Sequence, residues 1–270
     1  MRRIRVIPVL TMEDQRLVKT MKFGKRTYVG DPVNTMKIFN DKEVDEIILL
    51  DIGKERALLG PDYAYLRELT SECFIPLGYG GGIRTLDQAK QVFAAGVEKV
   101  CLNTAVFDVE TLIGEVARIF GAQAVVASID VRRGGLFGRE HVVTDCGRRK
   151  VKRDPASVAQ RAVDLGAGEI LITAMDRDGT MDGYDLDLIR RVADAVPVPV
   201  IANGGASGIP DFLSAVRDAG ASAVAAGALF VFKGPHRAVL INYPQPQVLR
   251  EQLFLPASQP GSSTRNGGPS

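Results

Sequence analysis

The sequence contains no tryptophan, two histidines and three cysteines in 270 residues. Since His141 and His236 lie far apart in the chain, a histidine-rich metal site is not expected, and we expect no metal or organic cofactor. Cys73, Cys101 and Cys146 show no paired spacing, which favours a reducing compartment over a disulfide framework.

Long apolar runs and a strong excess of one charge are also missing. No stretch reaches the roughly 18 apolar residues that a membrane helix needs, and no apolar signal-peptide core follows the two arginines near the start. The formal net charge of +2 gives no reason to expect nucleic acid or a membrane surface as the main partner. We therefore expect a cytoplasmic protein, and its 46% hydrophobic and 24% charged residues are typical of one with a sizeable core.

Short β-branched runs alternate along the chain with helical segments. This alternation predicts βα units and a parallel sheet. Eight strands in about 240 residues favour a closed (β/α)8 TIM barrel over a doubly wound open sheet, which more often has a glycine-rich fingerprint after its first strand. The predicted strands cover residues 4–10, 46–51, 75–79, 99–103, 124–130, 169–173, 198–202 and 223–226.

Helix signals fit between these strands. Asp31-Pro32 and Asp154-Pro155 are suited to open helices, and Thr85 is suited to cap one. Two connections, 11–30 and 131–153, are longer than barrel loops need to be, and the second alternates enough to form a hairpin. We expect the barrel to occupy residues 1–250 and the Pro-, Ser- and Gly-rich end, 251–270, to be a disordered tail.

The chain also contains an internal repeat. The segment IPLGYGGGI (75–83) aligns with VPVIANGGA (198–206), and NTAVF (103–107) aligns with AGALF (226–230), both at an offset of 123 residues. The first strand, RVIPVLT, which ends at Thr11, aligns with AVVASID, which ends at Asp130. The barrel is therefore predicted to consist of two half-barrels.

The repeat brings glycines and turns to equivalent strand ends. Glycines after strands 3 and 7 let backbone N–H groups approach an anion, and the turns after strands 4 and 8 lead into helices, whose N-termini favour phosphate. One glycine pair alone would indicate only a tight turn, but two matching sets predict a substrate with a phosphate at each end. The residues are Gly81, Gly82, Asn103 and Thr104 in the first half, and Gly204, Gly205, Gly227 and Ala228 in the second.

Several motifs resemble one known family. YGGGIRT, LNTA, SID, GAGEILITAMDRDGTMDGYD and PVIANGGA are similar to the cyclase subunit of imidazole glycerol phosphate synthase, over about residues 3–250. The resemblance implies a duplicated (β/α)8 barrel, a bisphosphate substrate and a class I glutaminase partner whose ammonia crosses the barrel. That ammonia would react with a phosphoribulosyl-formimino-aminoimidazole-carboxamide ribotide, giving imidazole glycerol phosphate and the aminoimidazole carboxamide ribotide.

The resemblance also implies roles for individual residues. Asp130 matches the general acid/base on the fifth strand, and Lys19 matches a residue of the first loop that closes over substrate. Glu98 matches a position that faces the glutaminase. Further positions that match the substrate site are Asp51, Asp176 and Gly179. The residues that match a charged ring gating ammonia entry are Arg5, Glu46, Lys99 and Glu169.

Thr11 is a departure from this family, which has a second catalytic Asp at that position. A threonine hydroxyl does not titrate near neutral pH, and a general acid or base typically contributes ~10²–10⁴-fold. Glu13 or Asp14 could substitute from the loop, but the sequence places neither carboxylate at the site. We therefore expect the cyclase chemistry to be weakened or lost.

The segment ALFVFKGPHRAVLINYP (228–244) resembles a paralogous cyclase-like subunit from bacterial surface-polysaccharide clusters. Those paralogues are thought to deliver ammonia to a separate amidotransferase, which converts an acetamido group on a sugar into an acetamidino group. Three hypotheses follow. The chain is an ammonia-conducting subunit for amidino-sugar synthesis, a working histidine-pathway cyclase in which Thr11 is compensated, or a non-catalytic scaffold that activates the glutaminase.

Overall fold

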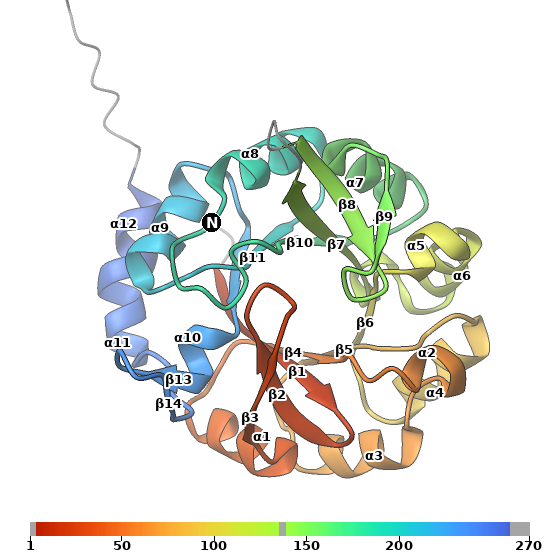
Figure 1. Ribbon diagram of the computed structural model, residues 1–270, viewed down its shortest axis with the longest axis horizontal. Helices are drawn as coiled ribbons and strands as arrows, with labels where there is room; N and C mark the ends of the chain where they lie inside the picture. Colours follow the sequence, from red (N-terminus) through yellow and green to blue (C-terminus); the bar gives the residue numbers. More distant parts are fainter. Residues whose placement is uncertain (1–3, 135–138, 260–270) are drawn as a thin grey trace, which may run out of the picture.

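The computed structural model describes residues 4–134 and 139–259, and in them eight parallel strands form a closed barrel surrounded by helices (Figure 1). Each barrel strand pairs with the next, and the pairs β12–β1 and β7–β10 complete the circle. The predicted (β/α)8 TIM barrel is confirmed. Its strands are β1 (Arg5–Glu13), β4 (Ile47–Asp51), β5 (Leu77–Gly80), β6 (Lys99–Leu102), β7 (Val125–Gly134), β10 (Glu169–Ala174), β11 (Val200–Asn203) and β12 (Ala223–Ala226).

Helices cover the outside of the barrel, and their starts follow the predicted signals. The side chains of Asp31, Thr85 and Asp154 each accept a hydrogen bond from a backbone N–H in the first turn of the helix that follows. The outer helices are α1 (Pro32–Asp41), α3 (Tyr63–Ser71), α4 (Leu86–Ala94), α6 (Thr111–Phe120), α7 (Pro155–Asp164), α8 (Leu186–Ala195) and α9 (Ile209–Arg217). Shorter helical turns are α2 (Arg56–Leu59), α5 (Ala105–Asp108), η1 (Ala122–Ala124) and α10 (Ala228–Val231).

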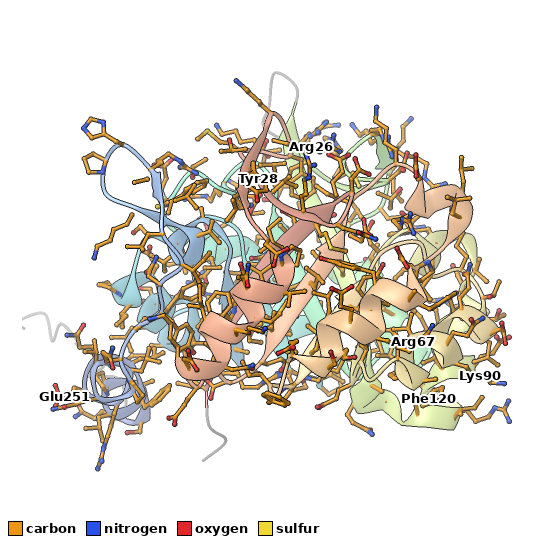
Figure 2. All side chains as sticks on the ribbon, turned by 90° about the horizontal axis from the view of Figure 1, so that it is seen from below. Arg26, Tyr28, Arg67, Lys90, Phe120 and Glu251 are labelled. Carbon is orange, nitrogen blue, oxygen red and sulfur yellow. The ribbon has the colours of Figure 1, made fainter. Side chains whose placement is uncertain are left out.

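The first strand of each half-barrel continues into an antiparallel hairpin. β7 pairs with β8 (Arg139–Thr144), which pairs with β9 (Arg149–Val151), as predicted for this segment. β1 likewise pairs with β2 (Arg16–Thr20), which pairs with β3 (Arg26–Gly30). Seen from the side, the hairpin that carries Arg26 and Tyr28 projects from one end of the barrel, and Phe120 lies toward the opposite end (Figure 2). Matching extensions agree with a barrel built from two half-barrels.

The C-terminal segment corrects the predicted start of the tail. Residues 251–258 are helical. Leu253 is fully buried and its turn packs against α9, which holds this segment to the barrel. The remainder of the predicted tail, 260–270, lies outside the described residues. The elements of this segment are β13 (Phe232–Lys233), β14 (Ala238–Val239), α11 (Pro246–Leu249), the π-helical turn η2 (Arg250–Phe254) and α12 (Leu255–Ser258).

A small hydrophobic cluster, separate from the core between strands and helices, consists only of barrel-strand residues and fills the interior. Since side chains alternate along a strand, residues two positions before or after these share the interior face. Polar and charged residues occupy many of those positions, so the interior is apolar in its middle and more polar toward both ends. Among them are Arg5, Glu46 and Lys99 at one end and Asn103, Thr173 and Asn203 at the other. The cluster contains Ile7, Val9, Ile48, Cys101, Val126, Leu171, Ile201, Ala223 and Ala225. Among the described residues, no helix has the length and apolar composition needed to cross a membrane.

Candidate functional site

A cavity of about 340 Å³ lies at the carboxyl ends of the barrel strands. Most of the residues predicted for the catalytic and substrate site line it together, although they come from strands far apart in the chain. Those in the lining are Thr11, Lys19, Asp51, Gly81, Gly82, Asn103, Thr104, Asp130 and Gly227. Those outside the lining are Asp176, Gly179, Gly204, Gly205 and Ala228.

Asp130 is a buried carboxyl at the point where β7 leaves the barrel. Burial raises its pKa to about 7, and the nearby Asp178 carboxylate adds to this rise. Hydrogen bonds from the Thr173 hydroxyl and the Asn103 amide act in the opposite direction, with Asn103 Nδ2 at 3.1 Å from Asp130 Oδ2. A carboxyl with a pKa near neutral can both accept and release a proton, as a general acid/base requires.

Thr11 lies at the equivalent end of β1. Its hydroxyl donates a hydrogen bond to the backbone carbonyl of Val18, its register partner on β2. The hydroxyl proton is therefore engaged by the hairpin backbone. The two half-barrels consequently present unlike groups to the cavity, one that titrates near neutral pH and one that does not.

A second carboxyl with a raised pKa lines the cavity next to Thr11. Asp51 ends β4, and burial raises its pKa to about 6 against the lowering effects of the Gly53 N–H and of Arg56. The two loop carboxylates suggested by the sequence lie elsewhere. Glu13 forms an ion pair with Arg26 at 2.9 Å, Asp14 is exposed, and neither lines the cavity.

Lys19 reaches into the cavity wall from the first hairpin. Its Nζ lies 2.7 Å from Asp178 Oδ2, and both side chains are almost fully buried. The backbone N–H of Lys22 donates to the Asp178 carbonyl, so the hairpin rests on the loop after β10. Asp178 is not among the residues predicted from the sequence, whereas Asp176 is. Asp176 accepts a hydrogen bond from the Arg133 backbone and lies outside the cavity lining.

The two predicted phosphate sites differ in how they face the cavity. On the first wall, Gly81 and Gly82 have positive φ angles of 143° and 68°, and any side chain at Gly82 would overlap the Arg56 carbonyl. Besides Lys19, further basic side chains line the cavity as a whole, as expected where an anion binds. They are Arg26, Lys54, Arg56, Arg84 and Arg148.

On the second wall, the backbone at the predicted phosphate site is covered by other segments. The Gly183 N–H donates to the Gly205 carbonyl at 2.8 Å, and a Cβ at Gly205 would overlap the Gly183 carbonyl. The Gly179 carbonyl accepts a hydrogen bond from Arg237 at 2.8 Å. Both glycine pairs are closely approached by neighbouring backbone, but Gly81 and Gly82 line the cavity, whereas Gly204 and Gly205 do not.

The four charged residues predicted as a gate form a closed ring at the other end of the barrel. Each lies two residues before a member of the interior cluster, so all four point inward. Lys99 Nζ lies 2.9 Å from Glu46 Oε1 and 3.0 Å from Glu169 Oε2. Arg5 contacts the same two carboxylates, at 2.8 Å from Glu169 Oε1 and through a short contact with Glu46. Each of the two cations is thus ion-paired with both of the two carboxylates across the interior.

Two side chains at this end of the barrel are exposed next to strand starts. Glu98, directly before β6, is exposed, and Phe74, which precedes β5, has 82% of its surface exposed. An aromatic side chain so fully exposed is typical of a protein contact surface. The described residues contain no cluster of three or more His, Cys, Asp or Glu side chains arranged to hold a metal ion.

Comparison with known proteins gives consistent matches. The sequence profile of the family described as histidine biosynthesis protein matches residues 5–235. A Pseudomonas aeruginosa protein, provisionally named imidazole glycerol phosphate synthase subunit hisF2, is 50% identical over 242 residues, covering 90% of this chain and 96% of its own. A Vibrio vulnificus protein, provisionally named subunit hisF3, is 44% identical over 94% of this chain and 98% of its own. The imidazole glycerol phosphate synthase subunit HisF of Alkaliphilus metalliredigens is 42% identical over 84% of this chain and 89% of its own.

Proposed function

Because the chain belongs to the histidine biosynthesis protein family, among the cyclase subunits of the imidazole glycerol phosphate synthase type, we propose that it receives ammonia from a class I glutaminase. The ammonia enters through the ring of Arg5, Glu46, Lys99 and Glu169 and crosses the apolar interior. It is then delivered to the cavity that contains Asp130.

Three features of the barrel interior support this route. The charged ring closes one end by mutual ion pairs, so an ion from solution would have to displace one of them. The middle of the barrel is apolar, which favours a small neutral molecule such as ammonia over a hydrated ion. The cavity at the far end contains the buried polar groups Asp130, Thr173 and Asn203.

A further proposal concerns the fate of the ammonia, and the Thr11 hydroxyl carries it. This hydroxyl donates to the Val18 carbonyl at the strand end equivalent to that of Asp130. Without a titrating group at this strand end, ring closure loses one of the two groups that exchange protons, so we propose that the cyclase reaction is weak. The ammonia then passes to a separate sugar amidotransferase, which forms an acetamidino group during surface-polysaccharide synthesis in the cytoplasm. The resemblance of segment 228–244 to the paralogous branch supports this acceptor.

A second candidate function is a working cyclase in histidine biosynthesis, in which Asp51 replaces the missing carboxyl. Asp51 is favoured over Glu13 and Asp14 because it lines the cavity, ends the strand that pairs with β1, and has a pKa raised to about 6. Asp51 and Asp130 would then be two carboxyls with separated pKa values in one cavity.

The stoichiometry of the assembled complex distinguishes these functions. The chain and its glutaminase are mixed with glutamine and the formimino ribotide, and glutamate and imidazole glycerol phosphate are both quantified. We expect roughly 10² or more molecules of glutamate per molecule of imidazole glycerol phosphate, because one catalytic group is absent. A ratio near one contradicts the first proposal and supports the second, with Asp51→Asn then abolishing product formation.

A further inference from the structure

Three polar side chains on neighbouring strands form a row where the cavity meets the interior of the barrel. Asp130 on β7 is the register partner of Thr173 on β10, and Thr173 is the register partner of Asn203 on β11. All three are buried and line the cavity. Asn203 follows Ile201 of the interior cluster by two residues, so its side chain points inward above the apolar middle of the barrel.

The hydrogen bonds along this row have a direction. Asn203 Nδ2 lies 3.1 Å from Thr173 Oγ1 and donates to it. A hydroxyl has a single proton, and an oxygen that accepts from Asn203 keeps that proton available for another acceptor. The Asp130 carboxylate lies on the same face of the neighbouring strand as its register partner, and its interaction with the Thr173 hydroxyl lowers the pKa of Asp130. If the amide were turned around, its carbonyl oxygen would compete with Asp130 for the same proton.

This orientation of the amide leaves an acceptor unused. Asn203 Oδ1 is buried and has no hydrogen-bond partner among the described residues. A buried acceptor without a partner is destabilising, and native structures rarely contain one without a reason. The Asn203 side chain is therefore poorly explained by its contribution to folding.

We propose that Asn203 is a positioning residue, whose amide N–H directs the Thr173 hydroxyl proton to the Asp130 carboxylate and so favours the ionised form of Asp130. This proposal rests on the proposed role of Asp130 at the cavity. Asn203 acts only through Thr173. It sets the fraction of Asp130 that is able to accept a proton near neutral pH.

The other groups around Asp130 act on it from different elements. Asn103, just after β6, donates to it from the opposite side, and Asp178 in the loop after β10 opposes its ionisation while paired with Lys19 of β2. Cys146, in the turn between β8 and β9, interacts electrostatically with Asp130. None of these interactions with Asp130 involves Thr173. Their contributions to the pKa of Asp130 should therefore stay constant when only Asn203 is changed.

The test measures the titration of Asp130 itself, by ¹³C NMR of carboxyl-labelled aspartates, with the signal assigned through Asp130→Asn. Asn203→Asp is nearly isosteric and offers a carboxyl in place of the amide N–H, so that Thr173 can turn its proton away from Asp130. The added charge also acts directly on Asp130. That direct effect is measured alone by making Asn203→Asp in a Thr173→Val background. Asn203→Leu removes the donor without adding charge, and Asn34→Leu on the exposed face of α1 is a control.

We expect Asn203→Asp to raise the Asp130 titration midpoint by about one pH unit more when Thr173 is present than in the Thr173→Val background. Asn203→Leu should shift it in the same direction by less, and Asn34→Leu should leave it unchanged. Equal shifts in both backgrounds, or a midpoint insensitive to both Asn203 variants in folded protein, would overturn the proposal. Since the NMR titration needs no turnover, this outcome is separate from failure of the proposed ammonia transfer or cyclase reaction.

Discussion

Thr11 and Asp130 occupy equivalent strand ends of the two half-barrels and differ in what their side chains can do with a proton. The Asp130 carboxyl titrates near neutral pH because burial disfavours its charge. The Thr11 hydroxyl is bonded to the Val18 carbonyl and has no accessible titration. The chemistry available to the cavity therefore depends mainly on one residue of this pair.

The raised pKa of Asp130 predicts a pH-dependent cost in stability. Its pKa is about 7 in the folded chain and 3.8 when unperturbed, so the favourable contribution of the neutral carboxyl is complete below about pH 4 and lost as pH rises through 7. Asp130→Asn should therefore be more stable than the wild type at pH 8, by up to about 4 kcal/mol, with little difference at pH 4. Urea unfolding at the two pH values measures this. Asp194→Asn, at an exposed position, is the control, and equal differences at both pH values would contradict the assigned cause.

At the scale of elements, the two hairpins are related by the repeat but held differently. The hairpin β2–β3 is fixed to the loop after β10 by the buried pair Lys19–Asp178 and by the Lys22 N–H. The hairpin β8–β9 closes the opposite side of the cavity with Cys146 and Arg148. A substrate entering near β2–β3 must therefore compete with an internal ion pair.

Asp178→Asn should loosen only the first hairpin. The substitution keeps the size of the side chain but removes a charge-assisted hydrogen bond of roughly 1.5–3 kcal/mol. Amide hydrogen exchange in β2 and β3 should therefore accelerate by roughly ten- to a hundredfold, while exchange in β8 and β9 stays unchanged. Unaltered exchange in β2 and β3, or equal acceleration in both hairpins, would show that the ion pair does not hold the hairpin.

The charged ring at the amino ends of the strands should couple glutamine hydrolysis to ammonia delivery. Lys99→Ala leaves Glu46 and Glu169 with one shared cation and opens a path for exchange with solvent. In the glutaminase complex supplied with amide-¹⁵N glutamine and excess unlabelled ammonium, the variant's product should carry several-fold less ¹⁵N than wild-type product. Lys37→Ala, which breaks an exposed ion pair on α1, should not change the label. An undiluted label in Lys99→Ala would count against the gate.

The sequence was sufficient for the barrel because buried parallel strands tend to be continuous apolar runs, and many of the eight appear as such. It did not predict the β2–β3 hairpin, because β3 is mostly exposed and has no apolar alternation. It predicted Asp176 for the site and did not single out Asp178, which lines the cavity. Both belong to one short turn after β10, and only the path of that turn, with the Asp178 N–H bonded to Ala174, brings the second carboxylate into the cavity.

At the scale of the whole molecule, the two ends of the barrel carry different groups. The carboxyl ends of the strands hold the cavity, and the amino ends hold the charged ring beside Phe74 and Glu98. The apolar interior separates them. We propose that the glutaminase docks at the amino ends of the strands, where Phe74 is exposed. The hairpin that carries Tyr28 projects from the other end (Figure 2).

Phe74→Ser should weaken binding of the glutaminase. A central aromatic side chain in an interface contributes typically about 2 kcal/mol, so Kd should rise roughly thirtyfold. Isothermal titration calorimetry measures this, with Tyr28→Ser as a matched control, because Tyr28 is 60% exposed on the hairpin at the other end of the barrel. Equal affinity of the glutaminase for the Phe74→Ser and wild-type proteins would show that Phe74 is not part of the docking surface.

The most direct test of the account is the rate at which the isolated barrel converts the formimino ribotide and ammonium into imidazole glycerol phosphate. We expect slow turnover by the wild type, an increase of roughly 10²-fold or more in Thr11→Asp, and loss of that gain in Thr11→Asp combined with Asp130→Asn. Rapid wild-type turnover that Thr11→Asp does not increase would contradict the proposed loss of a catalytic group at Thr11.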